Sequence, residues 1–436
     1  MIVFMYLPAW GRRVLVVLIA LGLGGSTRLA TSAASGGVDA RVPRAQRSSA
    51  HHAPVVTGRL SPAPATGAFG LDLMNGLGAG NVVFSPDSIA SALAMTGAGA
   101  AGETASQMAR VLHLTSPAAF PAVGRLQATI AAEQAAAGQG DPQAPTLNIA
   151  NGLFLQQGFQ VLPSYLSGLQ TSFGATPQSV DFENHPVAAV QAINAWVSAH
   201  TNGIIPRIIN SVPEQARLVL ANAIYLKAAW LDPFKVSATA PAPFHARAGV
   251  VTAPFMHETD TLPYGHGRGY AAVELPYLAS TLSLLVVLPT GQSVSSLQHR
   301  LDAGMLARIA RKLTPRPVAL SLPRFHVEVH RELNHSLESL GMTAPFGQAA
   351  DFSRIATGEP LKLGQVEHAA DFEVDEQGTL AVAATTVVVE ATALEVAPPA
   401  TVRFDADRPF LFFLRDDRTG AVLFAGRLED PAAPPA

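Results

Sequence analysis

The stretch Asn81-Val82-Val83-Phe84-Ser85-Pro86-Asp87-Ser88 combines a short apolar run with a proline and two serines. The apolar residues predict a brief strand that ends at Pro86, because proline cannot donate a ladder hydrogen bond. Ser88 is predicted to be the N-cap of a helix that carries Ile89 and Leu93 on one face. A buried strand that leads directly into a helix is therefore expected here.

The rest of the chain predicts a single α+β domain. Apolar residues at helical spacing indicate a helix from Ala188 to Thr201, whereas the continuous apolar run from Leu282 to Leu288 has the length of a buried strand. The runs 410–414 and 421–425 flank a polar turn and predict a hairpin. No internal repeat or linker divides the residues between 66 and 431.

Composition excludes several classes of function. The chain has 436 residues, 48% of them hydrophobic and 14% charged, with a net charge of −3 that gives no reason to expect a nucleic-acid partner. It has no cysteine, which excludes thiol catalysis. No Gly-x-Ser-x-Gly, His-Glu-x-x-His or phosphate-binding glycine loop is present, so no catalytic residue, metal ion or cofactor is expected.

The N-terminus has the order of a secretory signal peptide. Arg12-Arg13 precede an apolar run from Val14 to Leu23, and the small residues Ala30 to Ala34 follow. We predict a cleaved signal at 1–34 and secretion without a remaining membrane segment; the alternative is an uncleaved anchor. The polar, proline-containing residues 35–65 predict a disordered arm. The domain is then 66–431 and the C-terminal tail 432–436.

Further motifs follow the quoted stretch and its continuation along the whole domain. They are Asn222-Ala223-Ile224-Tyr225-Leu226-Lys227 with Trp230, Leu322-Pro323-Arg324-Phe325, Leu340-Gly341-Met342, Ala350-Asp351-Phe352-Ser353, Arg408-Pro409-Phe410-Leu411 and Phe424-Ala425-Gly426-Arg427. In their content and order these motifs resemble those of the serpins, the large family of serine protease inhibitors.

The resemblance implies the serpin fold and a secreted, inhibitory member of the family. That fold has a large central, mostly antiparallel sheet, surrounding helices, further sheets and an exposed reactive-centre loop, here about Gln377 to Val396. It also implies that a serine protease cleaves the loop, forms a covalent acyl complex and is trapped when the loop inserts into the sheet. A monomer without enzymatic activity is expected. The alternatives are a non-inhibitory serpin (a carrier, chaperone or storage protein) and an enzyme on the same fold.

The run from Thr379 to Val389 has strand composition, with small and β-branched residues and neither proline nor charge. Taken alone it could be an ordinary edge strand. Alternate side chains of a strand share a face, and those that would face a packed core here are small, which suits insertion because extra core volume is costly. Leu380 and Val382 depart from the family pattern but fall on the opposite face. The hinge residues implied by the resemblance are Glu376, Gly378, Thr379, Ala381, Ala383 and Ala384.

The family's hinge spacing places the reactive bond at Thr392-Ala393, with Ala391 and Leu394 as alternatives. None of these residues is basic. A small or aliphatic side chain fits an elastase-like pocket, and Leu394 would fit a chymotrypsin-like one, whereas the buried aspartate of a trypsin-like pocket would be left unpaired.

Two further groups of residues match family positions that control opening of the sheet. Trp230 matches the tryptophan at the loop's entry point, called the breach. The polar cluster beneath the sheet, called the shutter, is predicted to contain Ser85, Ser88, Asn222 and His368.

The region from Pro117 to Ala137 carries Arg125 as its only basic residue, so heparin binding is not expected.

Overall fold

The opening motif forms strand β1 (Val82–Phe84) and helix α2 (Pro86–Gly97), as predicted, but another residue caps the helix. Ser85 is the N-cap, and its hydroxyl accepts a hydrogen bond from the backbone N–H of Ser88 at 3.1 Å. The prediction of Ser88 as the cap is wrong because Pro86 takes the first helical position, where its missing N–H costs nothing. Ser88 lies in the first turn, which leaves its hydroxyl for a partner outside the helix.

The computed structural model describes residues 62–434 except 142, 201–202, 204–206, 208, 213–215, 357–360, 365 and 380–399, and only the backbone of 223, 330, 367 and 369. The predicted signal peptide, most of the predicted arm and the predicted reactive bond lie outside the described residues. Helix α1 (Pro62–Gly76) begins four residues before the predicted start of the domain, and its first turn buries Ala63 and Ala65. The described residues belong to one compact unit.

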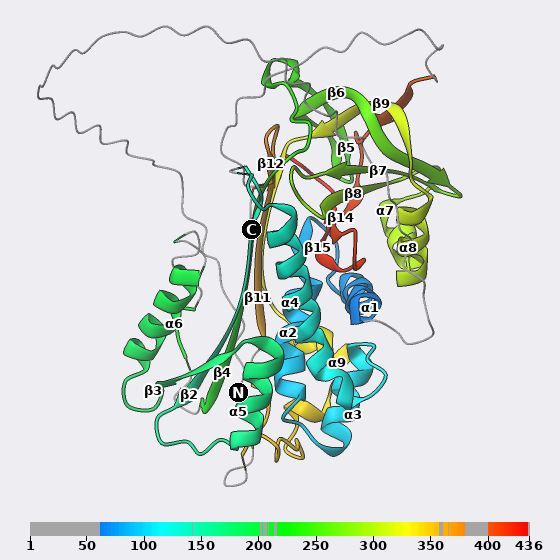
Figure 1. Ribbon diagram of the computed structural model, residues 1–436. Coiled ribbons are helices and arrows are strands. Elements are labelled where there is room, and N and C mark those ends of the chain that lie inside the picture. The colour runs from blue at the N-terminus through cyan, green and yellow to red at the C-terminus, as the bar shows by residue number, and fades with distance from the viewer. Residues whose placement is uncertain are drawn as a thin grey trace, which may run out of the picture. The chain divides into compact units, whose positions relative to one another are not determined.

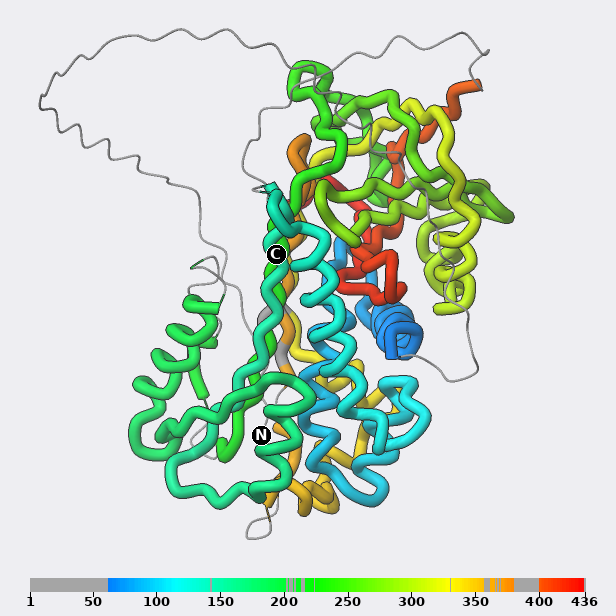
Figure 2. The backbone as a smooth tube through the Cα atoms, in the orientation of Figure 1, coloured from blue at the N-terminus to red at the C-terminus, as the bar shows by residue number. Residues whose placement is uncertain are grey.

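Most of the helices come from the first half of the chain. The helix predicted at 188–201 is confirmed as α6, and Figure 2 shows α1 lying beside the C-terminal strands. The remaining helices are α3 Gly102–Val111, α4 Phe120–Ala137, α5 Pro163–Phe173, α6 Pro186–His200, α7 Val294–Arg300, α8 Ala303–Lys312 and α9 Asn334–Ser339, with the 3-10 turns η1 Pro117–Ala119, η2 Val236–Ala238 and η3 Ala344–Phe346.

The strands form two mostly antiparallel sheets, which confirms the predicted α+β class. A nine-stranded sheet has the order β1-β15-β14-β8-β7-β6-β9-β13, with β5 on β6, and a six-stranded sheet has the order β10-β11-β12-β4-β2-β3. Only the pairs β2–β3 and β13–β9 are parallel among the described strands. The strands other than β1 are β2 Thr146–Gln156, β3 Thr176–Val180, β4 Leu218–Ala229, β5 Ala240–Ala246, β6 Gly249–Gly267, β7 Tyr270–Pro276, β8 Leu282–Pro289, β9 Thr314–Pro323, β10 Phe325–Glu332, β11 Glu367–Val374, β12 Gly378–Thr379, β13 Val402–Asp405, β14 Phe410–Asp416 and β15 Val422–Leu428.

Both predicted strand features are present. The apolar run becomes β8, which is buried along its whole length, and the predicted hairpin becomes β14 and β15, paired from Phe410↔Leu428 to Arg415↔Val422. A continuous apolar run is typical of a strand that is covered on both faces.

Three apolar clusters hold the layers together. Phe325 and Phe372 of the six-stranded sheet pack on Phe412 of the other sheet, with ring centroids 5.1 and 5.3 Å apart. Helices α2 and α4 cover one face of the six-stranded sheet and α6 covers the other, which Figure 1 shows nearly edge-on. Burial of aromatic side chains between the two sheets contributes about 1.5–3 kcal/mol each, and it fixes the sheet against which any inserted strand must fit.

Candidate functional site

The hinge segment already contributes a short strand to the six-stranded sheet. Strand β12 lies between β11 and β4, with Thr379 opposite Val374 on one side and Ala228 on the other (Figure 1). Among the described residues β12 alone joins these two strands, since no ladder runs directly between β11 and β4. The loop that the sequence predicts to insert therefore has its first residues within the sheet.

Gly378 is required at this position by the close approach of β4. Its φ is +151°, and a Cβ atom there would lie 2.0 Å from the carbonyl oxygen of Ala228. Contact with a backbone atom at that distance cannot be relieved by a side-chain rotation. The hinge glycine that the resemblance implied thus has a steric reason for its position.

Glu376 is a buried residue that accepts hydrogen bonds from three other residues. Arg324 Nε donates to Glu376 Oε1 at 2.7 Å, the Thr239 hydroxyl donates to the same oxygen, and the Phe234 N–H donates to the Glu376 carbonyl oxygen at 2.9 Å. Burial acts to raise the pKa of Glu376, but the hydrogen bonds from Arg324 and Thr239 outweigh it and the pKa is lowered. The carboxylate is therefore held in its charged form.

Trp230 holds the turn that precedes β12. Its Nε1 donates to the Asp375 carbonyl oxygen at 2.9 Å, and its backbone N–H donates to the Gln377 carbonyl oxygen at 2.9 Å. The Asp375 carboxylate closes the turn by accepting from the N–H groups of Gln377 and Gly378 at 2.8 and 3.1 Å. The structure thus places the predicted breach residue against the entry of the loop.

Thr379 meets a tyrosine that the sequence reasoning missed. Its Oγ1 lies 2.6 Å from the hydroxyl oxygen of Tyr277, and both residues are 2% exposed. The Tyr277 ring stacks on Trp230 with centroids 4.6 Å apart and an interplanar angle of 14°. Burial raises the pKa of Tyr277, although the hydrogen bond with Thr379 opposes this, so the phenol stays protonated.

The four predicted shutter residues come together around the start of α2. The Ser85 N–H donates to His368 Nε2 of β11 at 3.2 Å, and the Ser88 hydroxyl donates to Asn222 Oδ1 of β4. Helix α2 therefore contacts both of the strands that flank β12.

The shutter continues into a buried polar chain that the sequence did not predict. Asn222 Nδ2 donates to Asn151 Oδ1 at 2.7 Å, Asn151 Nδ2 donates to Gln127 Oε1 at 3.2 Å, and Gln127 Nε2 donates to Asp87 Oδ2 at 2.7 Å. Ser91 adds a hydrogen bond to Gln127 Oε1 at 2.8 Å. The donors all point toward Asp87, so this carboxylate is the final acceptor of the chain.

Asp87 is the least satisfied group of this chain. It is fully buried, and its second oxygen, Oδ1, has no hydrogen-bond partner among the described residues. Burial raises the pKa of Asp87 to about 6, although the hydrogen bond from Gln127 acts to lower it. A charged residue between the two predicted shutter serines was the signal in the sequence that could have revealed it.

Comparison with known proteins decides the family. The model of the family "Serpin (serine protease inhibitor)" matches residues 64–431. The chain belongs to the serpin family. An uncharacterized serpin-like protein of Thermococcus kodakarensis is 36% identical over 352 residues, which cover 80% of this chain and 81% of that protein. The leukocyte elastase inhibitor of Bos taurus is 35% identical over 365 residues, covering 81% of this chain and 94% of that protein.

The solved structures agree with the serpin fold. The native thermophilic serpin tengpin superposes with a TM-score of 0.74 at 26% identity, covering 84% of this chain and 94% of that one. The predicted fold, with its large sheet, surrounding helices and further strands, is thereby confirmed.

Part of this serpin's predicted site lies outside the described residues. This holds for the inner hinge residues Ala381, Ala383 and Ala384, for the reactive bond Thr392-Ala393, and for its alternatives Ala391 and Leu394. The residues that the structure places together are Glu376, Gly378, Thr379 and Trp230 at the breach, and Ser85, Ser88, Asn222 and His368 at the shutter. The sequence did not predict four residues that contact the breach residues, which are Arg324, Thr239, Tyr277 and Asp375.

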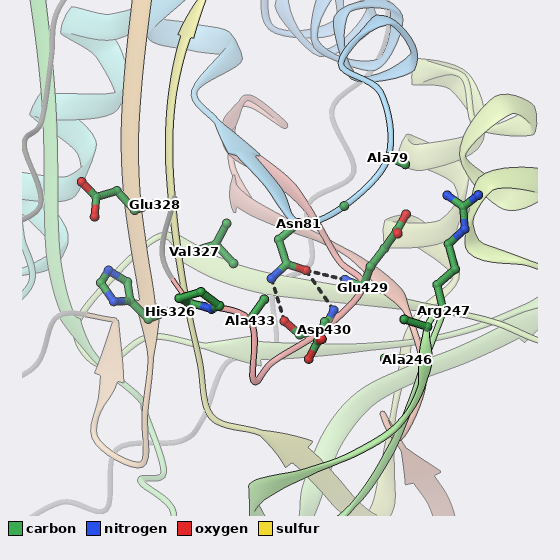
Figure 3. A pocket seen from close by; sticks show the side chains of 13 residues that line it. Ala79, Asn81, Ala246, Arg247, His326, Val327, Glu328, Glu429, Asp430 and Ala433 are labelled. Carbon is green, nitrogen blue, oxygen red and sulfur yellow. Dashed lines mark hydrogen bonds between the residues drawn. The ribbon is translucent and has the colours of Figure 1, made fainter.

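The described residues of the serpin domain also line several cavities. One of about 600 Å³ lies beside Asn81, whose side chain holds the C-terminal residues Glu429 and Asp430 through three hydrogen bonds (Figure 3). In that view His326 and Glu328 extend to the opposite side of their strand from Val327. No set of three or more His, Asp or Glu side chains in the described ranges could hold a metal ion, and none of the described helices is long and apolar enough to cross a membrane.

Proposed function

We propose that this serpin is a secreted inhibitor of serine proteases that works by cleavage of its loop and insertion of the cleaved loop as a sheet strand. The observation that carries the proposal is the position of β12 between β11 and β4. Insertion from this starting point adds residues to a strand that already has partners on both sides. Each added residue gains ladder hydrogen bonds to two neighbours, which favours completion of the strand.

The covalent step uses the chemistry of the protease. Its serine oxygen attacks the carbonyl carbon of Thr392, the bond from Thr392 to Ala393 breaks, and the new amino group of Ala393 takes the proton. An ester then links Thr392 to the protease. If the loop inserts before water cleaves this ester, the protease moves with the loop and stays covalently bound to Thr392.

The residues near the proposed bond favour an elastase-like or chymotrypsin-like protease. Ala391, Thr392 and Ala393 are small and Leu394 is aliphatic, and such side chains suit apolar specificity pockets. The name of the similar leukocyte elastase inhibitor of Bos taurus supports the first class. The signal-like order of residues 1–34 supports secretion, and the proposal includes a monomer without cofactor or heparin dependence.

The test is formation of a covalent complex. Purified protein is incubated with elastase, chymotrypsin and trypsin, and the products are separated on denaturing gels. We expect a band with the mass of elastase or chymotrypsin plus that of the serpin without its C-terminal fragment, and none with a protease whose active-site serine is replaced by alanine. Mass spectrometry of the released C-terminal fragment identifies the bond.

Other outcomes would favour the alternatives. Clean cleavage without a complex for every protease tried would indicate a non-inhibitory serpin. Turnover of small esters by the serpin alone, retained after Thr379→Arg, would indicate an enzyme.

A further inference from the structure

Beyond Gly378, few side chains of this serpin's hinge distinguish one register from a register two residues away. From Thr379 to Ala384 the side chains are Thr, Leu, Ala, Val, Ala and Ala, none of them charged. A slip of one residue would turn Leu380 and Val382 toward the packed side, whereas a slip of two residues keeps the same side chains on each face. Productive insertion therefore needs a contact that distinguishes one register from its neighbours.

The hydroxyl pair at the breach supplies such a contact. Within residues 376–384 Thr379 is the only residue with a hydroxyl group. The hydroxyl group of Tyr277 lies 2.6 Å from it, in a site where both side chains are 2% exposed. A slip of one residue would place Gly378 or Leu380 opposite the tyrosine, and its buried hydroxyl would lose its partner. An unsatisfied buried hydroxyl costs on the order of a tenfold or greater change in an equilibrium.

Tyr277 is itself held rigidly, so it can act as a fixed reference. Its ring stacks on Trp230, its backbone N–H donates to the Leu282 carbonyl oxygen at 3.1 Å, and Trp230 in turn binds the turn before β12 through Asp375. Tyr277 and the hinge are thus also joined indirectly, through the contacts of Trp230 with both.

We propose that Tyr277 fixes the register at which the hinge enters the sheet, through the hydrogen bond between its hydroxyl group and that of Thr379. Tyr277 is a positioning residue, because it touches the inserting segment at Thr379 and has no part in the chemistry of the reactive bond. The inference rests on the proposed function for its consequence, because a loop in the correct register competes better with hydrolysis of the acyl ester. The contact itself exists before any protease binds.

A double-mutant cycle tests the proposal on the uncleaved protein. The variants are Tyr277→Phe, Thr379→Val and the two together, and the measurement is hydrogen exchange of the peptide that contains residues 375–379. Each single change leaves one buried hydroxyl without its partner, so we expect about tenfold faster exchange. In the double variant both hydroxyls are gone, and we expect about tenfold rather than the product of about a hundredfold.

The matched control is Tyr165→Phe. Its hydroxyl is also buried and donates to the Met95 carbonyl oxygen at 3.1 Å, away from the hinge. It should lower thermal stability without changing exchange at the hinge. Multiplicative effects of the two hinge changes, no effect of either, or an equal effect of Tyr165→Phe would each overturn the proposal.

The number of serpin molecules consumed per trapped protease then links register to inhibition. We expect it to rise for both single variants and to rise no further in the double variant. If no protease is trapped by the unaltered protein, the proposed function fails, while the exchange cycle still decides whether Tyr277 sets the register. If complexes form and the cycle shows no coupling, the function stands and the inference fails.

Discussion

Asp87→Asn should make this serpin more stable at pH 8 and not at pH 4. The pKa of Asp87 is raised from its ordinary value of 3.8 to about 6 in the folded protein, mainly because burial disfavours the charged form. Below pH 3.8 the carboxyl group is neutral in both the folded and the unfolded chain. Between pH 3.8 and 6 the unfolded chain loses the proton and the folded chain keeps it, so folded-state stability falls as the pH rises through this window.

The size of the effect follows from the same shift. Two pH units correspond to about 3 kcal/mol, which is the full cost of holding the charge inside the protein above pH 6. Asparagine removes that cost. Its amide group, however, places buried N–H groups where the Asp87 oxygen has no partner among the described residues, and leaving them unpaired costs about 1 kcal/mol. We expect a net gain of about 2 kcal/mol at pH 8 and a loss of about 1 kcal/mol at pH 4.

Thermal unfolding followed by circular dichroism at pH 4, 5, 6, 7 and 8 measures this difference. The midpoint of the variant minus that of the unaltered protein should change sign, rise between about pH 4 and pH 6 and level off above pH 6, by several degrees in total. Glu338→Gln is the control, because it removes one charge from an exposed position in α9. A difference that does not vary with pH, or one that Glu338→Gln reproduces, would refute the assignment of a destabilising buried charge to Asp87.

Three further predictions concern the hinge. Thr379→Arg should convert the inhibitor into a substrate, since a charge would have to enter the sheet interior; gels with elastase should show cleavage without complex, and a retained complex would contradict insertion. Gly378→Ala should displace β12, because its Cβ would lie 2.0 Å from the Ala228 carbonyl oxygen, and faster hydrogen exchange at 375–379 would report it. Glu376→Gln should lower stability by about 1–2 kcal/mol at pH 7, a modest value since Arg324 is partly exposed. Because the pKa of Glu376 is lowered, the thermal midpoints of variant and unaltered protein should converge as the pH falls below the ordinary value of 4.5.

Local signals in the sequence were sufficient for much of the fold. Strand β8 was predicted from a continuous apolar run, and the hairpin of β14 and β15 from two apolar runs that flank a polar turn. Such runs are easily recognised because a strand that is buried on both faces consists almost entirely of apolar residues. The cap of α2 was missed because the sequence offers two serines three residues apart, and the preference of Pro86 for the first helical position, which decides between them, was not used. The strand and the helix follow from their runs of apolar residues, whereas the first residue of the helix depends on this one proline.

The site was predictable to the extent that it lies on consecutive residues. Glu376 and Gly378 were named from the hinge pattern, but Arg324 is 52 residues from its carboxylate partner and Thr239 is 137 residues away. Tyr277 lies 102 residues from Thr379. No periodicity or spacing relates such positions, because the sheet order that unites them is set by the packing of the whole domain.

The register of β12 connects the breach to the shutter. Val374 and Ala228 both lie opposite Thr379, and if insertion continued in this register, Thr385 would lie between His368 of β11 and Asn222 of β4. These two residues are the ones that α2 holds, through the Ser85 N–H and the Ser88 hydroxyl. Thr385 shares a face with Thr379, and its hydroxyl could replace hydrogen bonds that must break when the strands part. A register error at the breach would bring Thr386 or Ala384 to the shutter instead, so the contact that sets the first residue also decides whether the polar groups at the shutter find a partner.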